Sequence, residues 1–546
     1  MRFSDGARAP AATQPCTLRD HPDWHRGRAR YWLWSIPVDC PAVLQRLQAA
    51  RTCLGDWLHA PGARQAHITL FVCGFASPQP VHNDDIAPAV LEAQCHALAA
   101  LRQPAFELHI GDLDSFTSAA FLAVQEHGHL DRLRDTLAGL APEVRQAPYA
   151  PHLTVGLYRD AFVKDEVARR LAGLPPGRED PAVAQAITTA MVEHWANPSS
   201  LYDPAVAAQD AIAAARARVA KTLHCRSDEI YFTACGSEGN NMAVTGAARP
   251  RKHWGNKIVV TGFEHPSVQR PIRALKDEGF TVVEVMPGAD GRIDTQKFLA
   301  EIDKNTVLAA CMAVNNETGA VQDIAALGKG IKARNSRTHF HVDAVQAWLR
   351  MPIDLQKWRE VDTLSVSGHK VHAPKGVGAL FIRDSQRQTL KPPYLGGHQE
   401  RGLRPGTENT PYIVGLGVAA AQGQQKLRPR IAHIAALNRQ LRAGLEELDG
   451  ITLNSPDDAV GEIVNFSTGC INSQTFINYL NTRAVYVSGG SACDKGEPSH
   501  TLMAMGAPDL AVRTALRVSF CGDNTPEDVQ ALLDGLKDGL KELQHI

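Results

Sequence analysis

Hydrophobic residues recur with two different periods in the first third of the chain. Alternating or continuous apolar runs predict four strands, at residues 31–37, 67–72, 119–124 and 152–157. Helical spacing predicts three helices, at residues 41–54, 130–140 and 160–172. This mixture of elements predicts an α+β unit over residues 29–177. The polar, proline-containing stretch before it, residues 1–28, predicts a flexible tail.

Proline and glycine cluster at residues 174–181, which predicts a domain boundary. Beyond it, short apolar runs alternate with helical stretches, as in a mostly parallel sheet that helices cover. The predicted strands are residues 258–261, 282–285, 307–312 and 338–343. The last part is predicted to hold a long helical region, a strand and a final helix, at residues 412–448, near 462–466 and from 526. Residues 178–546 are therefore expected to form an α/β domain.

The composition of the 546 residues is that of a globular protein, with 44% hydrophobic and 21% charged residues. The formal net charge of −1 provides no overall field for nucleic acid or an anionic membrane. The 11 cysteines are scattered and form no Cys-x-x-Cys pair, so we expect neither a disulfide scaffold nor a metal site. The chain begins without an apolar signal core and has no apolar run of membrane-spanning length, which predicts a cytoplasmic location.

Two side chains lie in settings that favour chemistry. Lys370 follows a small-residue turn and precedes the glycine-rich residues 374–379, which suits a lysine that forms an imine with a cofactor. Cys493 lies among glycines and serines in residues 488–493, which suits an exposed nucleophile. The pair indicates an enzyme that holds pyridoxal phosphate on the lysine and accepts sulfur on the cysteine.

Pyridoxal phosphate also needs an acid near its ring nitrogen, a phosphate cradle and a stacking partner. Asp343 ends an apolar strand and could pair with the ring nitrogen, and Gln346 could contact the ring hydroxyl. The glycine-containing turn at 233–241 follows a strand and would expose backbone N–H groups to phosphate. His265 could stack on the ring. Each feature alone is common in ordinary turns, caps and strands, but their order and spacing together favour a cofactor site.

On these motifs, residues from about 181 to 546 resemble the class V aminotransferase family, specifically its cysteine desulfurases of the NifS and IscS type. The motifs occur in the family's order, at residues 197–200, 232–241, 264–265, 314–319, 341–343, 367–370, 396–409, 490–493 and 516–519. The resemblance implies a pyridoxal-phosphate-dependent transferase of fold type I, with a mostly parallel sheet and large and small subdomains. The α+β unit would precede it.

The resemblance implies a role for each matching residue. Lys370 resembles the Schiff-base lysine, and Cys493 resembles the cysteine that carries the persulfide. His265 would stack on the cofactor ring, and Asn316 would contact the cofactor or the substrate. The other cofactor ligands in the same subunit would be Gly236, Ser237, Asp343, Gln346, Ser367 and His369.

Two further roles follow from the same resemblance. Arg517 would bind the substrate carboxylate, for which a bidentate guanidinium is well suited. Thr407 would reach the phosphate of a neighbouring subunit, which implies a homodimer with shared sites.

The implied reaction converts L-cysteine into L-alanine and leaves a persulfide on Cys493. The acceptor would be a protein, either an iron–sulfur cluster scaffold or a tRNA-thiolation factor.

Two alternatives stay open at this point. The first is another pyridoxal-phosphate lyase or transaminase of the same fold, against which Cys493 argues. The second is a cofactor-binding scaffold of weak activity that docks a sulfur acceptor or RNA. Release of sulfide and alanine from cysteine would separate the desulfurase from the scaffold.

The chain departs from the family's pattern in two places. Family members usually begin with a strand and loop that line the substrate pocket, whereas here residues 174–177 lead directly into residues 178–181. Only three residues separate Cys493 from Glu497, fewer than in members with a long cysteine loop. Sulfur transfer would therefore depend on a shorter segment than in those members.

A second pair of motifs lies in the N-terminal unit. His67 and Thr69, and 85 residues later His152 and Thr154, form two His-x-Thr motifs, each at the head of an apolar strand. With both strands facing one cleft, the histidines would act as general base and general acid, and the threonines would bind phosphate oxygens. Histidine and threonine are ordinary strand residues, so the interpretation depends on the repetition.

Residues from about 30 to 175 resemble the two-histidine phosphoesterase family, which includes 2′-5′ RNA ligase-like proteins and RNA 2′,3′-cyclic phosphodiesterases. Residues 150–158 match its second motif. The resemblance implies an RNA end with a 2′,3′-cyclic phosphate or a 2′-5′ linkage as the substrate. This family normally continues with further strands after the second motif. We therefore hypothesise a fusion that lost sequence on both sides of about residue 177.

Overall fold

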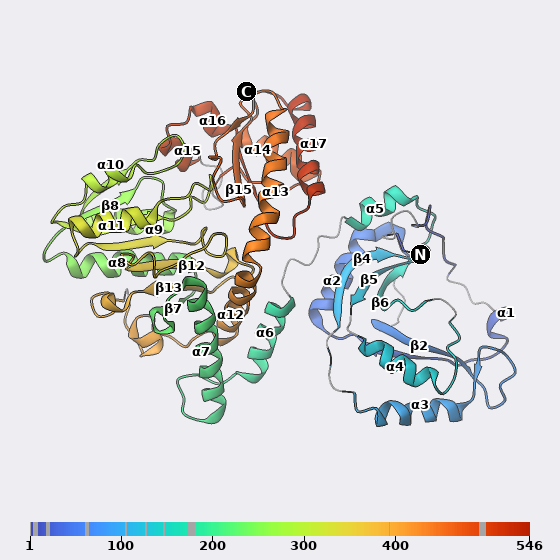
Figure 1. The fold of residues 1–546 in the computed structure, drawn as a ribbon. Coiled ribbons are helices and arrows are strands. Elements are labelled where there is room, and N and C mark those ends of the chain that lie inside the picture. The colour runs from blue at the N-terminus through green and yellow to red at the C-terminus, as the bar shows by residue number, and fades with distance from the viewer. Residues whose placement is uncertain are drawn as a thin grey trace. The chain divides into compact units, whose positions relative to one another are not determined.

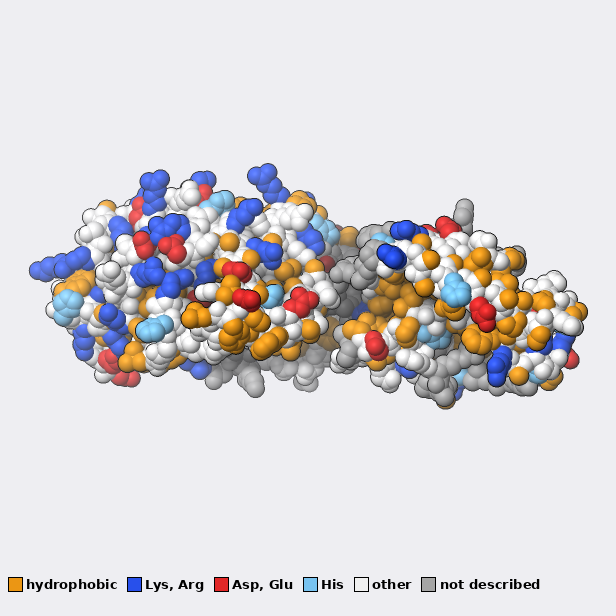
Figure 2. Space-filling view, turned by 90° about the horizontal axis from the view of Figure 1, so that it is seen from below, with side chains coloured by type: hydrophobic (Ala, Val, Ile, Leu, Met, Phe, Trp, Pro, Cys, Tyr) orange, Lys and Arg blue, Asp and Glu red, His pale blue; other side chains and the backbone are white. Residues whose placement is uncertain are grey.

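The structure is a computed structural model. It describes residues 2–3, 9–17, 22–60, 65–103, 106, 108–125, 128–145, 148–172, 181–392, 394–490 and 498–545. The chain divides into two compact units, Met1–Arg178 and Glu179–Ile546, which are described separately (Figure 1). Among the described helices, none has the length and apolar character that a membrane span requires. Basic and acidic side chains are mixed on the face shown in Figure 2, and hydrophobic side chains show on both units.

A six-stranded sheet forms the centre of the N-terminal unit. Its order is β1-β2-β6-β5-β4, all antiparallel, with β3 paired parallel to β2. The strands are β1 (Tyr31–Pro37), β2 (His67–Ala76), β3 (Asp85–Ile86), β4 (His109–Ser115), β5 (Ala119–Gln125) and β6 (His152–Leu157). The helices are α1 (Pro22–His25), α2 (Pro41–Leu54), α3 (Pro88–Ala100), α4 (His129–Ala138) and α5 (Lys164–Ala172).

Two hydrophobic clusters hold this unit together. Helices α2 and α5 pack against β4, β5 and β6, and α3 and α4 pack against β1 and β2. In α2, Leu47, Ala50 and Leu54 recur at helical spacing and are buried in the same cluster as Leu153 of β6. Pro41 begins this helix, where its missing N–H group leaves no hydrogen bond unmade. The predicted α+β class is confirmed.

The strand β4 is an element that the sequence pattern did not predict. Its residues, 109–115, are largely polar and lack the apolar alternation that marks the other strands. The strand exists because it pairs antiparallel with the mostly buried β5. Tertiary pairing therefore overrides a weak local pattern here.

The described residues of the N-terminal stretch are not a detached tail. The backbone N–H of Thr13 donates to the carbonyl of Phe162 at 2.9 Å, and that of Cys16 donates to the carbonyl of Tyr158 at 2.7 Å. The Thr13 side chain is buried and donates to a third carbonyl. The prediction of a flexible tail is thus wrong for residues 9–17, because their backbone groups find partners that no sequence pattern reveals.

Seven strands form the main sheet of the C-terminal unit, in the order β7-β13-β12-β11-β10-β8-β9. They are β7 (Ile230–Thr233), β8 (Lys257–Thr261), β9 (Thr281–Val285), β10 (Thr306–Met312), β11 (His339–Asp343), β12 (Thr363–Ser367) and β13 (Gly378–Ile382). All pairs from β12 to β9 are parallel, and β13 is antiparallel to both neighbours. The prediction of a mostly parallel sheet is confirmed.

Helices cover both faces of this sheet. They are α7 (Asp203–Leu223), α8 (Gly236–Arg251), α9 (Pro266–Asp277), α10 (Thr295–Ala300), α11 (Ile324–Arg334) and α12 (Thr410–Gln425). Helix α6 (Pro181–Glu193) packs against α12. Residues of α7, α10, α11 and α12 share one large core cluster with the central strands. Residues of α8 and α9 form a second cluster with β8 and β10. Burial on both faces explains why these strands are continuous apolar runs in the sequence.

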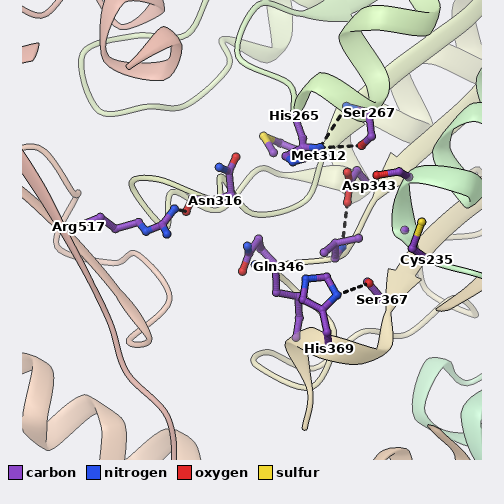
Figure 3. Close-up of a pocket in the computed structure, with 14 residues that line it drawn as sticks. Cys235, His265, Ser267, Met312, Asn316, Asp343, Gln346, Ser367, His369 and Arg517 are labelled. Atoms are coloured by element: carbon purple, nitrogen blue, oxygen red, sulfur yellow. Dashed lines mark hydrogen bonds between the residues drawn. The ribbon is translucent and has the colours of Figure 1, made fainter. Parts of the chain in front are cut away.

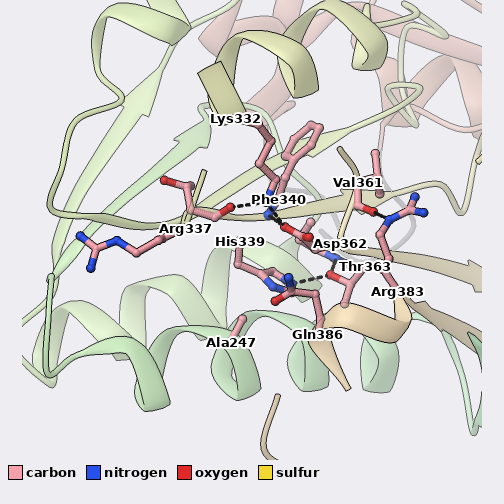
Figure 4. Close-up of polar contacts among 12 residues, drawn as sticks. Ala247, Lys332, Arg337, His339, Phe340, Val361, Asp362, Thr363, Arg383 and Gln386 are labelled. Atoms are coloured by element: carbon pink, nitrogen blue, oxygen red, sulfur yellow. Dashed lines mark hydrogen bonds and ion pairs between the residues drawn. The ribbon is translucent and has the colours of Figure 1, made fainter. Parts of the chain in front are cut away.

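A polar network fixes the start of β11, the strand that ends at Asp343 (Figure 4). The carboxylate of Asp362 accepts a hydrogen bond from Lys332 Nζ at 2.6 Å and one from the backbone N–H of Phe340 at 2.8 Å. His339 Nε2 lies 2.9 Å from the hydroxyl of Thr363 on the neighbouring strand. These bonds set the register of β11 against β12.

The last part of the chain builds a smaller subdomain. Its sheet order is β14-β15-β16. Its elements are α13 (Leu427–Glu446), β14 (Thr452–Leu453), β15 (Ile463–Ser467), α14 (Ser473–Thr482), α15 (His500–Ala504), α16 (Asp509–Arg513), β16 (Ala515–Ser519) and α17 (Pro526–Glu542). The tight turn at 314–321, which follows β10, docks on this subdomain. There Ser455 Oγ donates to the Thr318 carbonyl at 2.6 Å and Val460 N–H donates to the Gly319 carbonyl at 3.0 Å.

Candidate active site

A cavity of about 220 Å³ lies where several strands of the main sheet end. Parallel sheets place ligand sites at the carboxyl ends of their strands, because several loops converge there. The cavity is lined by Cys235, Gly236, Ser237, His265, Ser267, Met312, Asn316, Asp343, Val345, Gln346, Ser367, His369, Lys370 and Arg517 (Figure 3). The structure thus brings together residues that are separated by up to 282 positions in the sequence (235 to 517).

Asp343 is the buried carboxylate of this cavity. Its Oδ1 accepts a hydrogen bond from the backbone N–H of Val345 at 2.9 Å, and its Oδ2 accepts one from Asn240 Nδ2 at 2.7 Å. Burial raises the pKa of Asp343, since a charged carboxylate is poorly solvated there. A cationic partner in the cavity would offset this cost, so the carboxylate is suited to a protonated ring nitrogen.

His265 caps the start of α9, and its orientation is defined by its neighbours. Its Nδ1 accepts from the backbone N–H of Ser267 at 3.1 Å and lies 2.7 Å from the Ser267 hydroxyl. Asn240 Nδ2 donates to that same hydroxyl at 2.8 Å, so the hydroxyl proton is directed to the histidine. The Nδ1 atom therefore acts as an acceptor, and a neutral His265 carries its proton on Nε2.

Asn240 and Ser267 are site residues to which the sequence reasoning gave no role. The amide of Asn240 connects Asp343 and Ser267, and its Oδ1 lies 3.0 Å from His341 Nε2. Burial lowers the pKa of His341 to about 3, so this ring is neutral and donates to the amide. Asn240 stands within the motif at 232–241 and Ser267 follows the motif at 264–265 by two residues, but a supporting role needs the tertiary contacts.

Replacing Asn240 with alanine is expected to weaken cofactor retention about 10-fold, because a buried carboxylate loses a hydrogen bond and Ser267 loses its orientation. The dissociation constant of added pyridoxal phosphate, followed by absorbance, measures this effect. Asn438→Ala is the matched control, since Asn438 is also a buried amide but donates to Gly461 in the smaller subdomain. Equal retention in both variants would remove Asn240 from the site.

The start of α8 provides donors for an anion. Gly236 and Ser237 open this helix, and the first N–H groups of a helix have no partner within it. A Cβ atom at Gly236 would come within 2.7 Å of Val345 Cγ2, so only glycine allows this close approach. The hydroxyl of Ser367 lies 2.9 Å from His369 Nδ1 beside the same turn.

Lys370 and Arg517 reach the cavity from different subdomains. Lys370 ends the short 3-10 turn Gly368–Lys370 after β12. Arg517 extends from β16 toward Asn316, to whose carbonyl its Nη1 donates at 3.1 Å (Figure 3). Burial lowers the pKa of Arg517. An arginine in this setting gains from an anionic ligand, because desolvation strengthens the attraction between charges.

Two expected site residues are not placed in this cavity. Thr407 is exposed in the segment before α12, and it does not contribute to the cavity lining. Cys493 lies outside the described residues. The nearest described residues on either side of it are Gly490 and Pro498.

The donor set fits pyridoxal phosphate. Hydroxyls and a helix start supply anion donors, the buried Asp343 suits a ring nitrogen, and Lys370 supplies the amine. The histidine His265 adds a planar side chain at the cavity wall. No metal-binding group of three or more His, Cys, Asp or Glu side chains occurs among the described residues.

The two His-x-Thr motifs lie on adjacent strands of the N-terminal unit. Ile68 of β2 pairs with Leu153 of β6, antiparallel, and both side chains are buried. Side chains alternate across a strand, so the histidine and threonine that flank each of these residues face away from the buried pair. In this register each histidine lies opposite the threonine of the other motif. The structure therefore brings His67, Thr69, His152 and Thr154 onto one face.

Both histidines present the same ring nitrogen to a backbone carbonyl. His67 Nδ1 lies 2.8 Å from the Gln65 carbonyl, and His152 Nδ1 lies 2.7 Å from the Ala150 carbonyl. A carbonyl only accepts, so Nδ1 carries the proton and Nε2 is the basic nitrogen of each neutral ring. This tautomer is suited to general base and general acid chemistry.

The surroundings of His152 favour its neutral form. Burial lowers its pKa, and the positive charges of Arg145 and Arg2 lower it further. Two guanidinium groups near the histidine pair also make an anionic ligand favourable at this face.

Comparisons with known proteins find a family match for each of the two units. A family model described as aminotransferase class-V matches residues 176–532, and a model of the 2′-5′ RNA ligase superfamily matches residues 40–184. The first match spans most of the chain, and the fold and cavity accord with it. The chain belongs to the class-V aminotransferase family, with a 2′-5′ RNA ligase superfamily domain at its N-terminus.

Two relatives in that family are cysteine desulfurases. The chain is 36% identical to a cysteine desulfurase of Nostoc sp. over 376 residues, which are 67% of this chain and 91% of the relative. It is 36% identical to the cysteine desulfurase IscS of Clostridium botulinum over 369 residues, 66% of this chain and 91% of the relative. The resemblances read from the sequence motifs are confirmed.

Solved structures support the same assignment. A NifS-like protein superposes with a TM-score of 0.63 at 32% identity, covering 67% of this chain and 97% of that one. DndA from Streptomyces lividans superposes with a TM-score of 0.55 at 32% identity, covering 63% and 96%.

Proposed function

We propose that the C-terminal unit is a pyridoxal-phosphate-dependent cysteine desulfurase that converts L-cysteine into L-alanine and leaves a persulfide on Cys493. The observation that supports this most is the single cavity in which Lys370, Asp343 and Arg517 converge. The similarity to cysteine desulfurases supports L-cysteine as the substrate. The rival of another lyase or transaminase is disfavoured, because Cys493 stands in the persulfide motif.

Each residue then has a defined task. Arg517 binds the substrate carboxylate, and Asn316 orients the substrate or the cofactor hydroxyl beside it. When bound, pyridoxal phosphate supplies an electron sink for the substrate α-carbon. Lys370 first holds the cofactor and then takes the proton from the α-carbon. Asp343 keeps the ring nitrogen protonated.

The sulfur step is a nucleophilic displacement. The Cys493 thiolate attacks the substrate sulfur, a new S–S bond forms, and the substrate C–S bond breaks. The carbon keeps the electron pair of that bond and takes up the proton that the thiol loses, which yields alanine. One cysteine thus gives one alanine and one persulfide, and no external oxidant is consumed.

The remaining ligands complete the proposal. Gly236, Ser237, Ser367 and His369 hold the phosphate, Gln346 contacts the ring hydroxyl, and His265 stacks on the ring. Thr407 reaches the phosphate of a second subunit in a homodimer, which is consistent with its exposure in a single chain.

The persulfide passes to an acceptor protein. We place the reaction in the cytoplasm, where a free thiolate stays reduced.

The test is the reaction itself. Purified protein with pyridoxal phosphate, L-cysteine and a reducing thiol should release alanine and sulfide in equal amounts, and the bound cofactor should absorb near the edge of the visible range. Protein stripped of cofactor is the control. Absorbance without sulfide above that control would leave a cofactor-binding scaffold in place of the desulfurase.

We propose a second activity for the N-terminal unit, the hydrolysis of a 2′,3′-cyclic phosphate or a 2′-5′ linkage at an RNA end. The paired His-x-Thr motifs on one face, with the same tautomer in both histidines, favour it. One neutral histidine would take the proton of the attacking group, and the other, protonated, would give one to the leaving oxygen. The two threonines would bind the phosphate oxygens.

The pH profile of this hydrolysis is expected to depend on Arg145. Neutral His152 is the base, and its lowered pKa keeps it neutral below the usual histidine value, so activity should persist into mildly acidic solution. Arg145→Gln removes a nearby positive charge, raises the pKa of His152, and should move the acidic limb to higher pH. Rates on a nucleoside 2′,3′-cyclic phosphate from pH 5 to 8 measure the shift.

Arg132→Gln, on the exposed surface of α4, is the control for that experiment. An acidic limb that stays in place in Arg145→Gln would show that His152 is not the group that titrates.

A further inference from the structure

We propose that Glu317 is a positioning residue of the sulfur-transfer step, which holds the start of α15 and the backbone at Gly490 beside Arg517. This inference rests on the proposed desulfurase function and adds to it a residue that does not line the cavity. Its role is separable from the cofactor chemistry of Lys370.

The contacts of Glu317 connect two parts of the chain that are distant in sequence. The side chain is buried, with 3% exposure. Its Oε2 accepts from the Ser499 hydroxyl at 2.6 Å, and its Oε1 accepts from the Thr501 hydroxyl at 2.8 Å. A Cβ atom built on Gly490 would lie 3.4 Å from Oε2, so the backbone there packs directly on the carboxylate.

These contacts bracket the persulfide cysteine in the sequence. Gly490 precedes Cys493 by three residues, and Ser499 follows it by six. Both flanks therefore meet at one carboxylate. A substitution of Glu317 would therefore act on both flanks of Cys493.

The backbone of Glu317 is itself fixed. Asn315 Oδ1 accepts from the N–H groups of Glu317 and Thr318, both at 2.9 Å. Gly319 then takes a positive φ of 74°, which suits glycine in a tight turn. The turn docks on the smaller subdomain through Ser455. A carboxylate on such a turn has little freedom, so it can set the position of the groups that bind it.

The same carboxylate acts on the substrate clamp. Asn316 precedes Glu317, lines the cavity and accepts from Arg517 through its carbonyl. Burial lowers the pKa of Arg517, and the negative charge of Glu317 opposes that shift. Arg517 is also tied to the flank before Gly490, because its backbone pairs with Ser488. Glu317 thus connects the group that binds the substrate carboxylate with the flanks of the segment that must reach the substrate sulfur.

Variants of Glu317 and of its partner Thr501 test the role. Glu317→Gln keeps the shape and can still accept one hydroxyl proton, whereas Glu317→Ala loses both bonds. Thr501→Val removes one partner without changing the size of the side chain. Ser467→Ala is the matched control. The buried hydroxyl of Ser467 donates to the Ala511 carbonyl within the smaller subdomain, and Ser467 does not line the cavity.

The decisive readout separates the proton step from the sulfur step. In deuterated water, exchange of the substrate α-proton measures the proton step, which depends on Lys370 and the bound cofactor. Alanine release measures the sulfur-transfer step. We expect Glu317→Ala to lower the alanine rate about 10- to 100-fold while α-proton exchange and cofactor absorbance stay within about twofold. Glu317→Gln and Thr501→Val should fall between Glu317→Ala and wild type, and their effects should not add in the double variant.

Three results would overturn or support the positioning role of Glu317. Parallel loss of exchange and alanine release in Glu317→Ala, or full alanine release in both Glu317 variants, would overturn the positioning role. Ser467→Ala should keep both rates, and a selective loss of alanine release there would also overturn it. A wild-type protein that exchanges the α-proton but releases no alanine would instead refute the desulfurase function, so the two failures are distinguishable.

Discussion

Replacing Lys370 with alanine is expected to abolish alanine and sulfide release, with a loss of about 1000-fold or more. The proposed reaction uses this amine twice, to hold the cofactor and to move the α-proton. Among the described residues that line the cavity, none besides Lys370 can do both, since the others offer a carboxylate, hydroxyls, amides, imidazoles, a thiol and a guanidinium. The variant should also lose the absorbance of a lysine-bound cofactor.

Lys375→Ala is the matched control for Lys370→Ala. Lys375 is an exposed lysine five residues away in the same glycine-rich segment. Its replacement removes the same charge and side-chain length without touching the cavity lining. Sulfide release by Lys370→Ala at more than a hundredth of the wild-type rate would mean that another amine carries the cofactor.

Replacing Cys493 with serine is expected to abolish alanine release while the cofactor absorbance and α-proton exchange stay. A serine hydroxyl has no thiolate form near neutral pH, so it cannot attack the substrate sulfur. The loss should again reach about 1000-fold. Mass spectrometry should find the added sulfur on Cys493 in the wild type and on no residue of the variant.

Cys521→Ser controls for the general effect of removing a thiol. Cys521 follows β16 and is not part of the cavity lining. Persistent alanine release in Cys493→Ser would move the nucleophile elsewhere, and Cys235 would be the first thiol to test, because it does line the cavity. That outcome would leave the cofactor site unchanged.

We hypothesise that the chain lost sequence on both sides of the junction between the two units. The two family matches, residues 40–184 and 176–532, overlap at this junction. Expression of residues 1–177 and 178–546 as separate proteins is the test. Full activity and stability of both fragments would contradict the idea that each domain lacks a part.

Much of the fold was predictable because it is written in local patterns. The strand runs at 258–261 and 307–312 are continuous and apolar, since both faces of the sheet are covered, and they appear as β8 and β10. The helix at 41–54 begins with proline and keeps one apolar stripe, and it appears as α2. The polar strand β4 and the packed residues 9–17 were not predictable, because only their partners hold them.

The sequence by itself determined the chemistry: Lys370, Cys493 and the ordered motifs around them indicate a pyridoxal-phosphate desulfurase, and the two His-x-Thr motifs indicate a phosphoesterase. Motifs carry such information because a reaction needs particular side chains at particular distances along a turn or strand. Only the tertiary structure decided which distant residues support that chemistry. Asn240 joins Asp343 to Ser267, and Glu317 joins Arg517 to the flanks of Cys493. Supporting contacts depend on how strands and turns pack in space, and no local pattern records that packing.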